Sequence, residues 1–240
     1  KICNGVTVST NKLAKLLVKF NQNVIVLPNG VDYERFQESV KEVSKVNSIN
    51  KLKIICFSLA GAGVEMLNQL GSLLTEKSID HEVELYTGEG FDDDIYPYLT
   101  LKKNVSLDIL FKELNNADYL VNWGGHSIDY FEKLAKKYDF EIKDTECFVN
   151  AKSALKYYNA AISKTILLTT EIPFSYSEVV RNGVTGFYIK DAKEAFNYIM
   201  KLENDSVLKE HIANEAFHDV ISNYSLNTTS KNYLNFFNSR

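Results

Sequence analysis

The sequence is poor in cysteine. Its 240 residues include three, Cys3, Cys56 and Cys147, which lie far apart and form no Cys-x-x-Cys pair. This number and spacing argue against both a disulfide framework and a zinc site. Cys56 lies in the apolar run 54–57, so we expect it to be a small buried hydrophobic residue. A reducing, cytoplasmic location fits this pattern.

The chain also lacks any long hydrophobic run. No apolar stretch approaches the roughly 18 residues that a transmembrane helix needs, and the first residues show no signal-peptide pattern. We therefore expect no membrane span. The sequence opens with Lys1, Ile2 and Cys3 rather than with an initiator methionine, and we expect it to be a piece of a longer protein. Proline is rare while asparagine and lysine are abundant, which is typical of an AT-rich bacterial genome.

An excess of charge of one sign is missing as well. The 27 basic and 31 acidic side chains leave a net charge of -4. The lysines are spread among carboxylates along the predicted helices, whereas a nucleic-acid-binding protein usually presents a clustered basic face. The acidic run 92–94 is interpreted as a solvated loop, because magnesium sites usually combine carboxylates with substrate phosphates. We expect neither nucleic acid nor a metal ion as a partner.

Short apolar runs alternate with segments of helical periodicity along most of the chain. Strands are expected at residues 6–9, 24–27, 53–58, 83–86, 105–107, 119–122, 165–168 and 186–189, and helices at 12–20, 64–74, 109–115, 127–138, 152–161 and from 192 onward. Strands that alternate with helices imply parallel βαβ units, because neighbouring parallel strands need a crossover between them. The pattern predicts an α/β fold with a doubly wound parallel sheet, preceded by a βαβ remnant.

In such a sheet, ligands bind beyond the carboxyl ends of the strands. Gly61 and Gly63 follow a predicted strand and open a helix, where backbone N–H groups can face an anion. A tight turn without a ligand explains these glycines as well. Met66 stands where a dinucleotide-binding fingerprint needs its third glycine, which disfavours an NAD site. Gly124 closes another predicted strand and is a further candidate.

The segment 150–161 is the richest in polar side chains. Lys152, Lys156 and Asn159 recur at spacings of four and three, which places them on one face of a helix, with Ser153 beside them. If the first turn of this helix faces the ligand site, Lys152 lies where a diphosphate is favoured. The other interpretation is a pair of surface lysines.

Three blocks of the sequence resemble the glycosyltransferase group 1 family, which has the GT-B fold. The first, VTVSTNKLAKLL followed by VIVLPNGVDYERF, resembles the end of the acceptor domain and the entry to the donor domain. The second, NAKSALKYYNAAISKTILLTT, resembles the family's Lys-Ser-x-x-Lys-Tyr-x-Glu helix and the next strand. The third, EIPFSYSEVVRNGVTGFYI, resembles the family's Asn-Gly-x-x-Gly turn and its surroundings. With the helical tail, the resemblance covers most of the chain outside residues 80–145.

The resemblance implies four segments. Residues 1–36 correspond to the end of an N-terminal acceptor domain and the crossover, and residues 37–50 to a linker. Residues 51–222 correspond to a Rossmann-like GT-B donor domain that binds a nucleotide-sugar. Residues 223–240 correspond to a C-terminal helix that packs back on the acceptor domain.

The resemblance also places a donor site on this sequence. Its residues are Gly61, Gly63, Gly124, Lys152, Ser153, Lys156 and Asn159. Asn159 takes the position of a glutamate that binds the ribose hydroxyls, and Ala151 that of a glutamate near the transferred sugar. The loop 59–63 lacks the arginine and lysine that hold the diphosphate in many members, so Lys152 or Lys156 would supply that charge.

The function implied is that of a retaining glycosyltransferase of the hexosyltransferase type in surface polysaccharide synthesis. It would move a sugar from a nucleotide-diphosphate sugar to a glycan or lipid-linked acceptor, without a cofactor or metal. The resemblance implies a cytoplasmic protein with a peripheral membrane contact through the N-terminal domain. The substitutions at Asn159 and Ala151 leave an alternative open, in which the chain is a non-catalytic module or scaffold in a glycan assembly complex.

Overall fold

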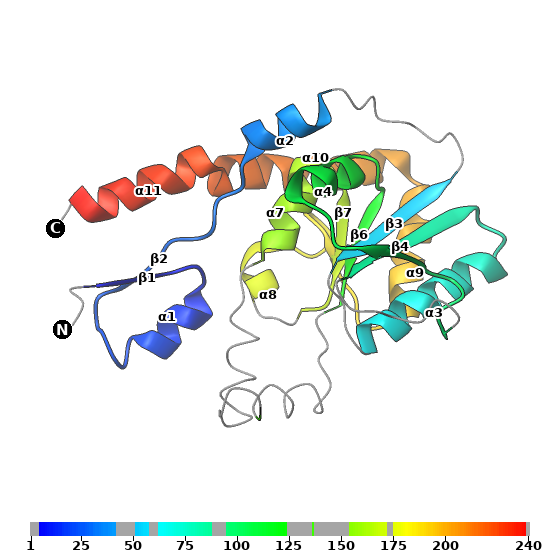
Figure 1. Cartoon of the computed structure of the whole chain (residues 1–240), viewed down its shortest axis with the longest axis horizontal. Coiled ribbons are helices and arrows are strands. Elements are labelled where there is room, and N and C mark those ends of the chain that lie inside the picture. Colours follow the sequence, from blue (N-terminus) through cyan, green and yellow to red (C-terminus); the bar gives the residue numbers. More distant parts are fainter. Residues whose placement is uncertain are drawn as a thin grey trace.

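The computed structural model describes residues 5–41, 51–57, 62–87, 95–123, 136, 154–171 and 175–238 (Figure 1). The larger of its two sheets contains six strands, β3 (Leu52–Phe57), β4 (His81–Thr87), β5 (Thr100–Lys103), β6 (Tyr119–Asn122), β7 (Ile166–Thr169) and β8 (Phe187–Tyr188). All neighbouring strands pair in parallel, in the order β5-β4-β3-β6-β7-β8. Counted from β3, this is the strand order 3-2-1-4-5-6, which reverses between β3 and β6. The prediction of a doubly wound α/β fold is confirmed.

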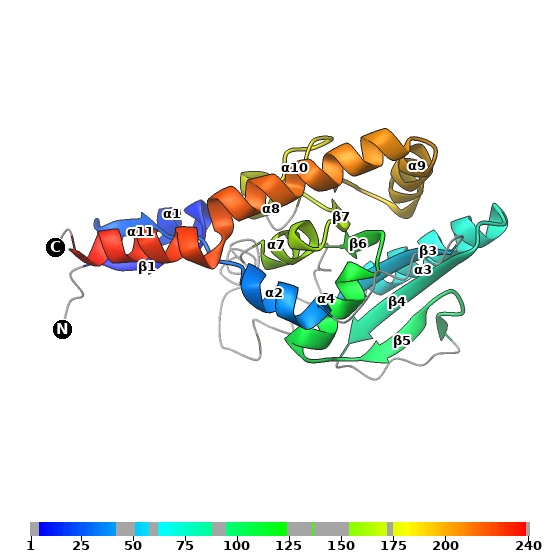
Figure 2. The same ribbon diagram turned by 90° about the horizontal axis from the view of Figure 1, so that it is seen from above.

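Helices cover both faces of this sheet (Figure 2). On one face lie α3 (Ala62–Glu76) and α9 (Ala192–Glu203), and on the other lie α4 (Leu107–Asn115), α7 (Leu155–Ile162) and the short α8 (Ser175–Val179). The long helix α10 (Ser206–Tyr224) contributes to both hydrophobic cores. Ile54 and Ile55 are both fully buried and belong to opposite cores, as in a strand that is covered on both faces.

A smaller body precedes the large sheet. It consists of β1 (Val6–Val8), α1 (Asn11–Leu17) and β2 (Val24–Val26), and its two strands pair in parallel. The chain then continues into α2 (Tyr33–Val40), which packs on α4. The expected βαβ remnant is therefore present, and α2 extends into the segment 37–50, which was expected to begin as a helix and continue as a linker. Residues 42–50 lie outside the described residues.

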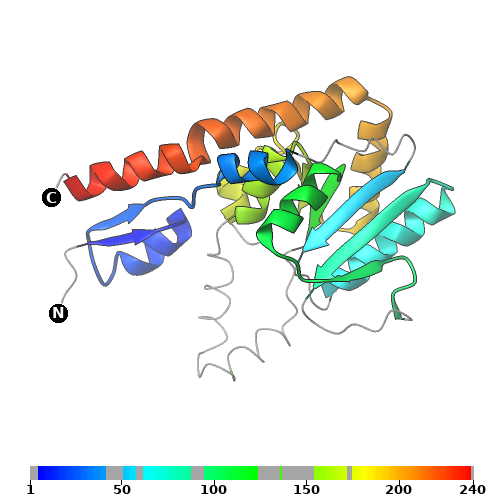
Figure 3. The same ribbon diagram turned by 45° about the horizontal axis from the view of Figure 1, so that its top comes forward.

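The two segments that join the smaller body to the rest of the molecule run side by side. Val31 forms a parallel bridge with Ser225, which lies between α10 and α11 (Leu226–Asn238). The Val31 N–H donates to the Tyr224 carbonyl at 2.8 Å, and the Leu226 N–H donates to the Val31 carbonyl at 3.0 Å. As a result, α11 and the strands β1 and β2 lie at the same end of the molecule (Figure 3).

One predicted strand is wrong. Residues 105–107 lead into α4, because the Ser106 hydroxyl accepts the Ile109 N–H and caps that helix. The strand lies earlier, at β5, an edge strand whose residues are exposed or half-buried and therefore carry no apolar pattern. The predicted helix 127–138 falls outside the described residues, apart from residue 136. Within the described part of the chain, no helix has the length and hydropathy to cross a membrane.

Candidate functional site at the strand ends

The point where the strand order reverses lies between β3 and β6. In a parallel sheet the carboxyl ends of these strands and of β7 lie at one edge. The last residues of β6 and β7 are polar, although both strands are buried along their whole length. Asn122 and Thr169 stand opposite each other in the register, and the Asn122 amide Nδ2 donates to the Thr169 hydroxyl at 3.0 Å. This bond fixes the orientation of the Asn122 side chain.

Lys156 reaches this edge from the first turn of α7. Its ammonium Nζ donates to the Phe57 carbonyl at 2.5 Å and to the Asn122 Oδ1 at 2.8 Å. The charge therefore lies at the junction of β3 and β6. A cation in the first turn opposes the helix dipole, and the carbonyl and amide oxygens offset that cost. The helix is held in place by its buried side, which includes Tyr157 and Tyr158.

Cys56 lies next to this position in β3 and is fully buried. Burial raises the pKa of its thiol to about 12, against the opposing effect of the nearby Lys156 charge. The thiol therefore stays protonated at neutral pH, and Cys56 fills space in the core as expected from the sequence. It is not a nucleophile in this site.

The structure brings one predicted donor-site residue, Lys156, to the reversal point. Gly63 is buried in the first turn of α3, the helix that follows β3. Asn159 is half-buried in α7, and its backbone carbonyl accepts a hydrogen bond from the Ser163 hydroxyl at 3.0 Å. The remaining predicted residues lie outside the described part of the chain: Gly61, Gly124, Lys152 and Ser153. Their roles and that of Asn159 stay predictions.

The sequence predicted ligand binding at the strand-end segments 122–126 and 169–177, but Asn122 and Thr169 were not among the predicted donor-site residues. Each is the polar last residue of a short apolar strand, and this is the signal that would have found them. A polar side chain that is buried at a strand end needs a hydrogen-bond partner. The exposed fractions of these two side chains are 4% and 0%, and each supplies the other's partner.

A second charged cluster lies on the neighbouring strands. The Glu84 carboxylate in β4 is 1% exposed and forms ion pairs with Lys53 of β3, at 3.2 Å, and with Lys102 of β5. The Tyr86 hydroxyl also donates to it, at 2.9 Å. Burial alone would raise the pKa of Glu84, but these hydrogen bonds and charges together lower it. Lys53 also binds Glu113 of α4 at 2.7 Å, so the cluster ties three strands and a helix together.

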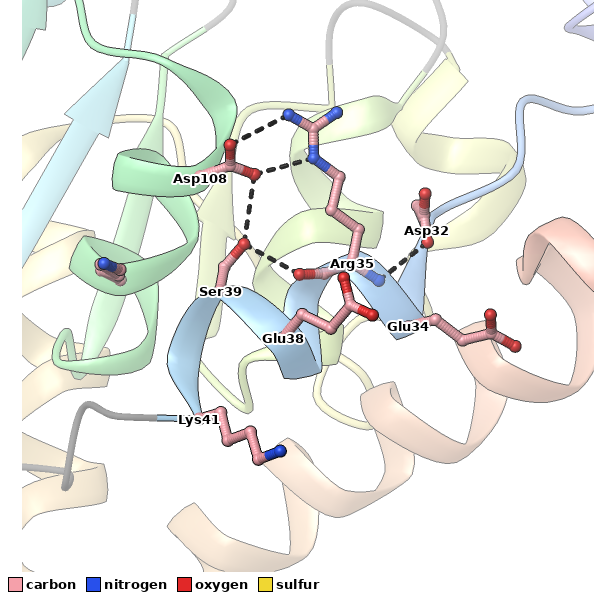
Figure 4. Close-up of a pocket in the computed structure, with 8 residues that line it drawn as sticks. Asp32, Glu34, Arg35, Glu38, Ser39, Lys41 and Asp108 are labelled. Atoms are coloured by element: carbon pink, nitrogen blue, oxygen red, sulfur yellow. Dashed lines mark hydrogen bonds and ion pairs between the residues drawn. The ribbon is translucent and has the colours of Figure 1, made fainter.

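A hollow with a volume of about 660 Å³ lies elsewhere, between α2 and α4 (Figure 4). Arg35 and Asp108 both line this hollow and form a bidentate ion pair, with Nε–Oδ1 and Nη2–Oδ2 distances of 2.7 and 3.2 Å. The Ser39 hydroxyl also donates to Asp108. The hydrogen bond from Arg35 holds the pKa of the Asp108 carboxyl below its usual range. The described residues that line this hollow do not include Lys156, Asn122 or Thr169, so the candidate site remains the one at the strand ends.

Among the described residues, no group of three or more histidine, cysteine, aspartate or glutamate side chains is placed to hold a metal ion.

Comparison with known proteins gives a match at the level of structure. No protein-family model and no curated protein matches the chain. The structure of HepE from Anabaena in complex with UDP and glucose matches this chain with 13% identity and a TM-score of 0.70. The match covers 99% of this chain and 64% of the HepE chain. TarM from S. aureus, in a complex that includes UDP, matches 98% of this chain and 44% of its own, with 19% identity and a TM-score of 0.65.

This chain shares the doubly wound α/β fold of the matched part of these GT-B structures. A third matched structure is a single domain. The C-terminal domain of LpcC, a group 1 family glycosyl transferase from Francisella tularensis, is matched over 100% of its length by 82% of this chain, with 14% identity and a TM-score of 0.55. The chain described here spans between 43% and 64% of the length of the first solved chains that it matches.

Proposed function

We propose that this chain is the nucleotide-sugar-binding half of a glycosyltransferase. The observation that carries the proposal is the Lys156 ammonium, which lies between β3 and β6 at the reversal point of a GT-B sheet. Ligands of doubly wound sheets bind at that point. The matched HepE, TarM and pneumococcal GtfA structures contain UDP, which supports a nucleotide-diphosphate sugar as the donor.

The chemical task of such a site is to stabilise the diphosphate that leaves the sugar. Positioned donors and cations are most effective where negative charge develops during the reaction. Lys156, with Lys152 and Ser153, would supply the charge and hydroxyl contacts, and the backbone at Gly61, Gly63 and Gly124 would approach the phosphates. Asn159 would bind the ribose through its amide. We propose a hexosyl transfer with retention of configuration, without a metal or other cofactor.

The proposed acceptor is a glycan or a lipid-linked glycan in bacterial surface polysaccharide synthesis. Residues 1–36 would form the end of an acceptor domain and the crossover, and residues 37–50 would link that domain to the donor domain, residues 51–222. The helix 223–240 would pack back on the acceptor domain. The smaller sheet supports this division, because two parallel strands alone rarely form a stable unit. The protein would act in the cytoplasm, with a peripheral membrane contact through the acceptor domain.

A second candidate function has its own support. Asn159 and Ala151 stand where the resembling family carries glutamates, and the loop 59–63 lacks basic side chains. An amide forms weaker hydrogen bonds than a carboxylate. On this alternative the chain is a non-catalytic module or scaffold within a glycan assembly complex.

Calorimetric titration of the full-length protein with UDP-, GDP-, ADP- and dTDP-sugars distinguishes the two functions. We expect one donor to bind, and Lys156→Met to weaken its binding at least tenfold, or about 1.4 kcal/mol. Lys201→Met, at an exposed position on α9, is the matched control and should bind like the unaltered protein. No binding of any donor, together with co-purification of an active transferase, would support the scaffold. If both variants bind the donor equally well, Lys156 is not part of the donor site.

A further inference from the structure

The N-terminus of α1, the helix of the smaller body, is capped by Thr10 and also by a side chain of the larger body. Glu178 of α8 accepts two hydrogen bonds at Oε2, from the Asn11 backbone N–H and from the Asn11 side-chain Nδ2, both at 3.0 Å. Its Oε1 accepts the Lys12 N–H at 3.2 Å. The local cap, the Thr10 hydroxyl, accepts the Leu13 N–H at 3.2 Å. Three successive N–H groups at the start of α1 are thus satisfied, two of them by a residue 166 or 167 positions away.

The sequence of α1 explains why a remote carboxylate fits here. The first N–H groups of a helix lack partners within the helix, and its N-terminus attracts negative charge. The first turn of α1 contains no acidic residue, so no neighbour in the chain supplies that charge. Hydrogen bonds from N–H groups to an ionised carboxylate are stronger than those to a neutral acceptor. Glu178 therefore meets a local need of α1 while it joins two separate parts of the molecule.

A second attachment of the smaller body is the paired crossover. The Val31–Ser225 bridge joins the two chain segments that connect the smaller body to the larger one. Ser225 has an extended backbone, which separates α10 from α11. Gly30 packs tightly at this point, since a Cβ there would lie 2.3 Å from the Thr229 Oγ1 and 2.8 Å from a Leu226 methyl group. The crossover fixes one point of the smaller body, and Glu178 fixes a second, on the helix that follows β7.

We propose that Glu178 is a latch that holds the smaller body in one orientation against the donor-domain fold. When the carboxylate releases Asn11 and Lys12, the smaller body pivots about the Val31–Ser225 crossover. Because α8 follows the carboxyl end of β7, the latch lies on the strand-end side of the sheet, where Asn122 and Lys156 are. The latch acts on the relative placement of the two bodies and does not depend on sugar-transfer activity.

The test measures orientation directly. Spin labels are attached at Lys15→Cys on α1 and Lys201→Cys on α9, both exposed positions, after Cys3 and Cys147 are replaced by serine. Electron–electron resonance should give one narrow distance distribution with Glu178 present. Glu178→Ala should broaden or shift it, while Glu210→Ala, at an exposed position on α10, should leave it unchanged. Glu178→Gln, which keeps the size and loses the charge, should give an intermediate distribution.

Hydrogen exchange separates a latch from a simple helix cap. Glu178→Ala should speed exchange of the Asn11 and Lys12 amides at least tenfold, while the amides of β3 and β6 keep their protection. A narrow distance distribution in both Glu178 variants would overturn the proposal, even with faster exchange at α1, because Glu178 would then cap the helix without controlling orientation. If Glu178→Ala reduces the protection of the β3 and β6 amides, the substitution has disturbed the larger sheet. The distance distribution of Glu178→Gln then decides between a latch and a helix cap.

Discussion

The two sheets of this molecule differ in how their strands are buried. In the larger sheet, β6 and β7 are buried at every residue. In the smaller sheet, β2 is half-buried along its length, and none of the residues of α1, all of which the structure describes, is buried. The larger sheet forms its own core, whereas the smaller one depends on contacts with the rest of the molecule.

The difference follows from layer geometry. A parallel sheet is stable when helices cover both of its faces, and the larger sheet has helices on both. The smaller sheet has two strands and one helix, and Val8 is the buried residue of its strands. The contacts that attach it to the rest of the molecule include those of Glu178 and of the Val31–Ser225 crossover, which are polar and backbone contacts. The same contrast between buried and exposed contacts should recur in the stability of variants.

The largest effect should come from matched isoleucine truncations in the two sheets. Ile54→Ala in β3 removes a fully buried side chain and should lower the free energy of unfolding by about 2 to 5 kcal/mol. Ile25→Ala in β2, where the side chain is half-buried, should cost less than about 1 kcal/mol. Urea unfolding of both variants measures the difference. Equal losses would show that the smaller sheet has a core comparable with that of the larger one.

An intermediate effect should separate a buried carboxylate from an exposed one. Glu84→Gln leaves Lys53 and Lys102 without their shared carboxylate and should cost about 1 to 3 kcal/mol at pH 7. Glu178→Gln, at an exposed position, should cost less than about 1 kcal/mol, although it loosens the latch. Urea unfolding at pH 7 measures both, and a larger loss for Glu178 would reverse the ranking of the two regions.

The pH dependence of the Glu84 effect has a defined sign. Its pKa in the folded protein lies below the ordinary value of 4.5, so its stabilisation is fully present above that pH and is lost as the pH falls through the folded pKa. The stability difference between the unaltered protein and Glu84→Gln should therefore be constant from pH 7 to about 5 and shrink below pH 4.5. A difference that grows on acidification would contradict this assignment.

The smallest effect is expected where α2 attaches to α4. The Arg35 and Asp108 side chains are 47% and 48% exposed, so water and salt screen their ion pair. Arg35→Gln should leave the urea midpoint unchanged at physiological salt, because the apolar contact of Phe36 with Phe111 remains. A Phe36→Ala variant is the comparison, and its midpoint should fall clearly. A loss for Arg35→Gln equal to that for Phe36→Ala would show that the ion pair, rather than the aromatic contact, attaches α2.

Sequence reasoning predicted the parts of the fold that carry an apolar period. The buried strands β3, β6 and β7 and the helices α3 and α9 lie within a few residues of their predicted ranges. The edge strand β5 was missed because exposed residues carry no such period, and the short helix α8 because five residues are too few to show one. Lys156 was selected for its spacing on a helix, but the spacing did not reveal which oxygens it contacts.

The sequence by itself determined the α/β class, the buried strands and the first-turn lysine of α7, because these depend on local periodicity and on the neighbours in the chain. The tertiary structure decided the rest. The strand order 3-2-1-4-5-6 brings Phe57 and Asn122 together around Lys156. The contact of Glu178 with α1 joins residues 166 and 167 positions apart. Such contacts depend on how the packed layers are arranged in space, and no local pattern in the chain specifies that arrangement.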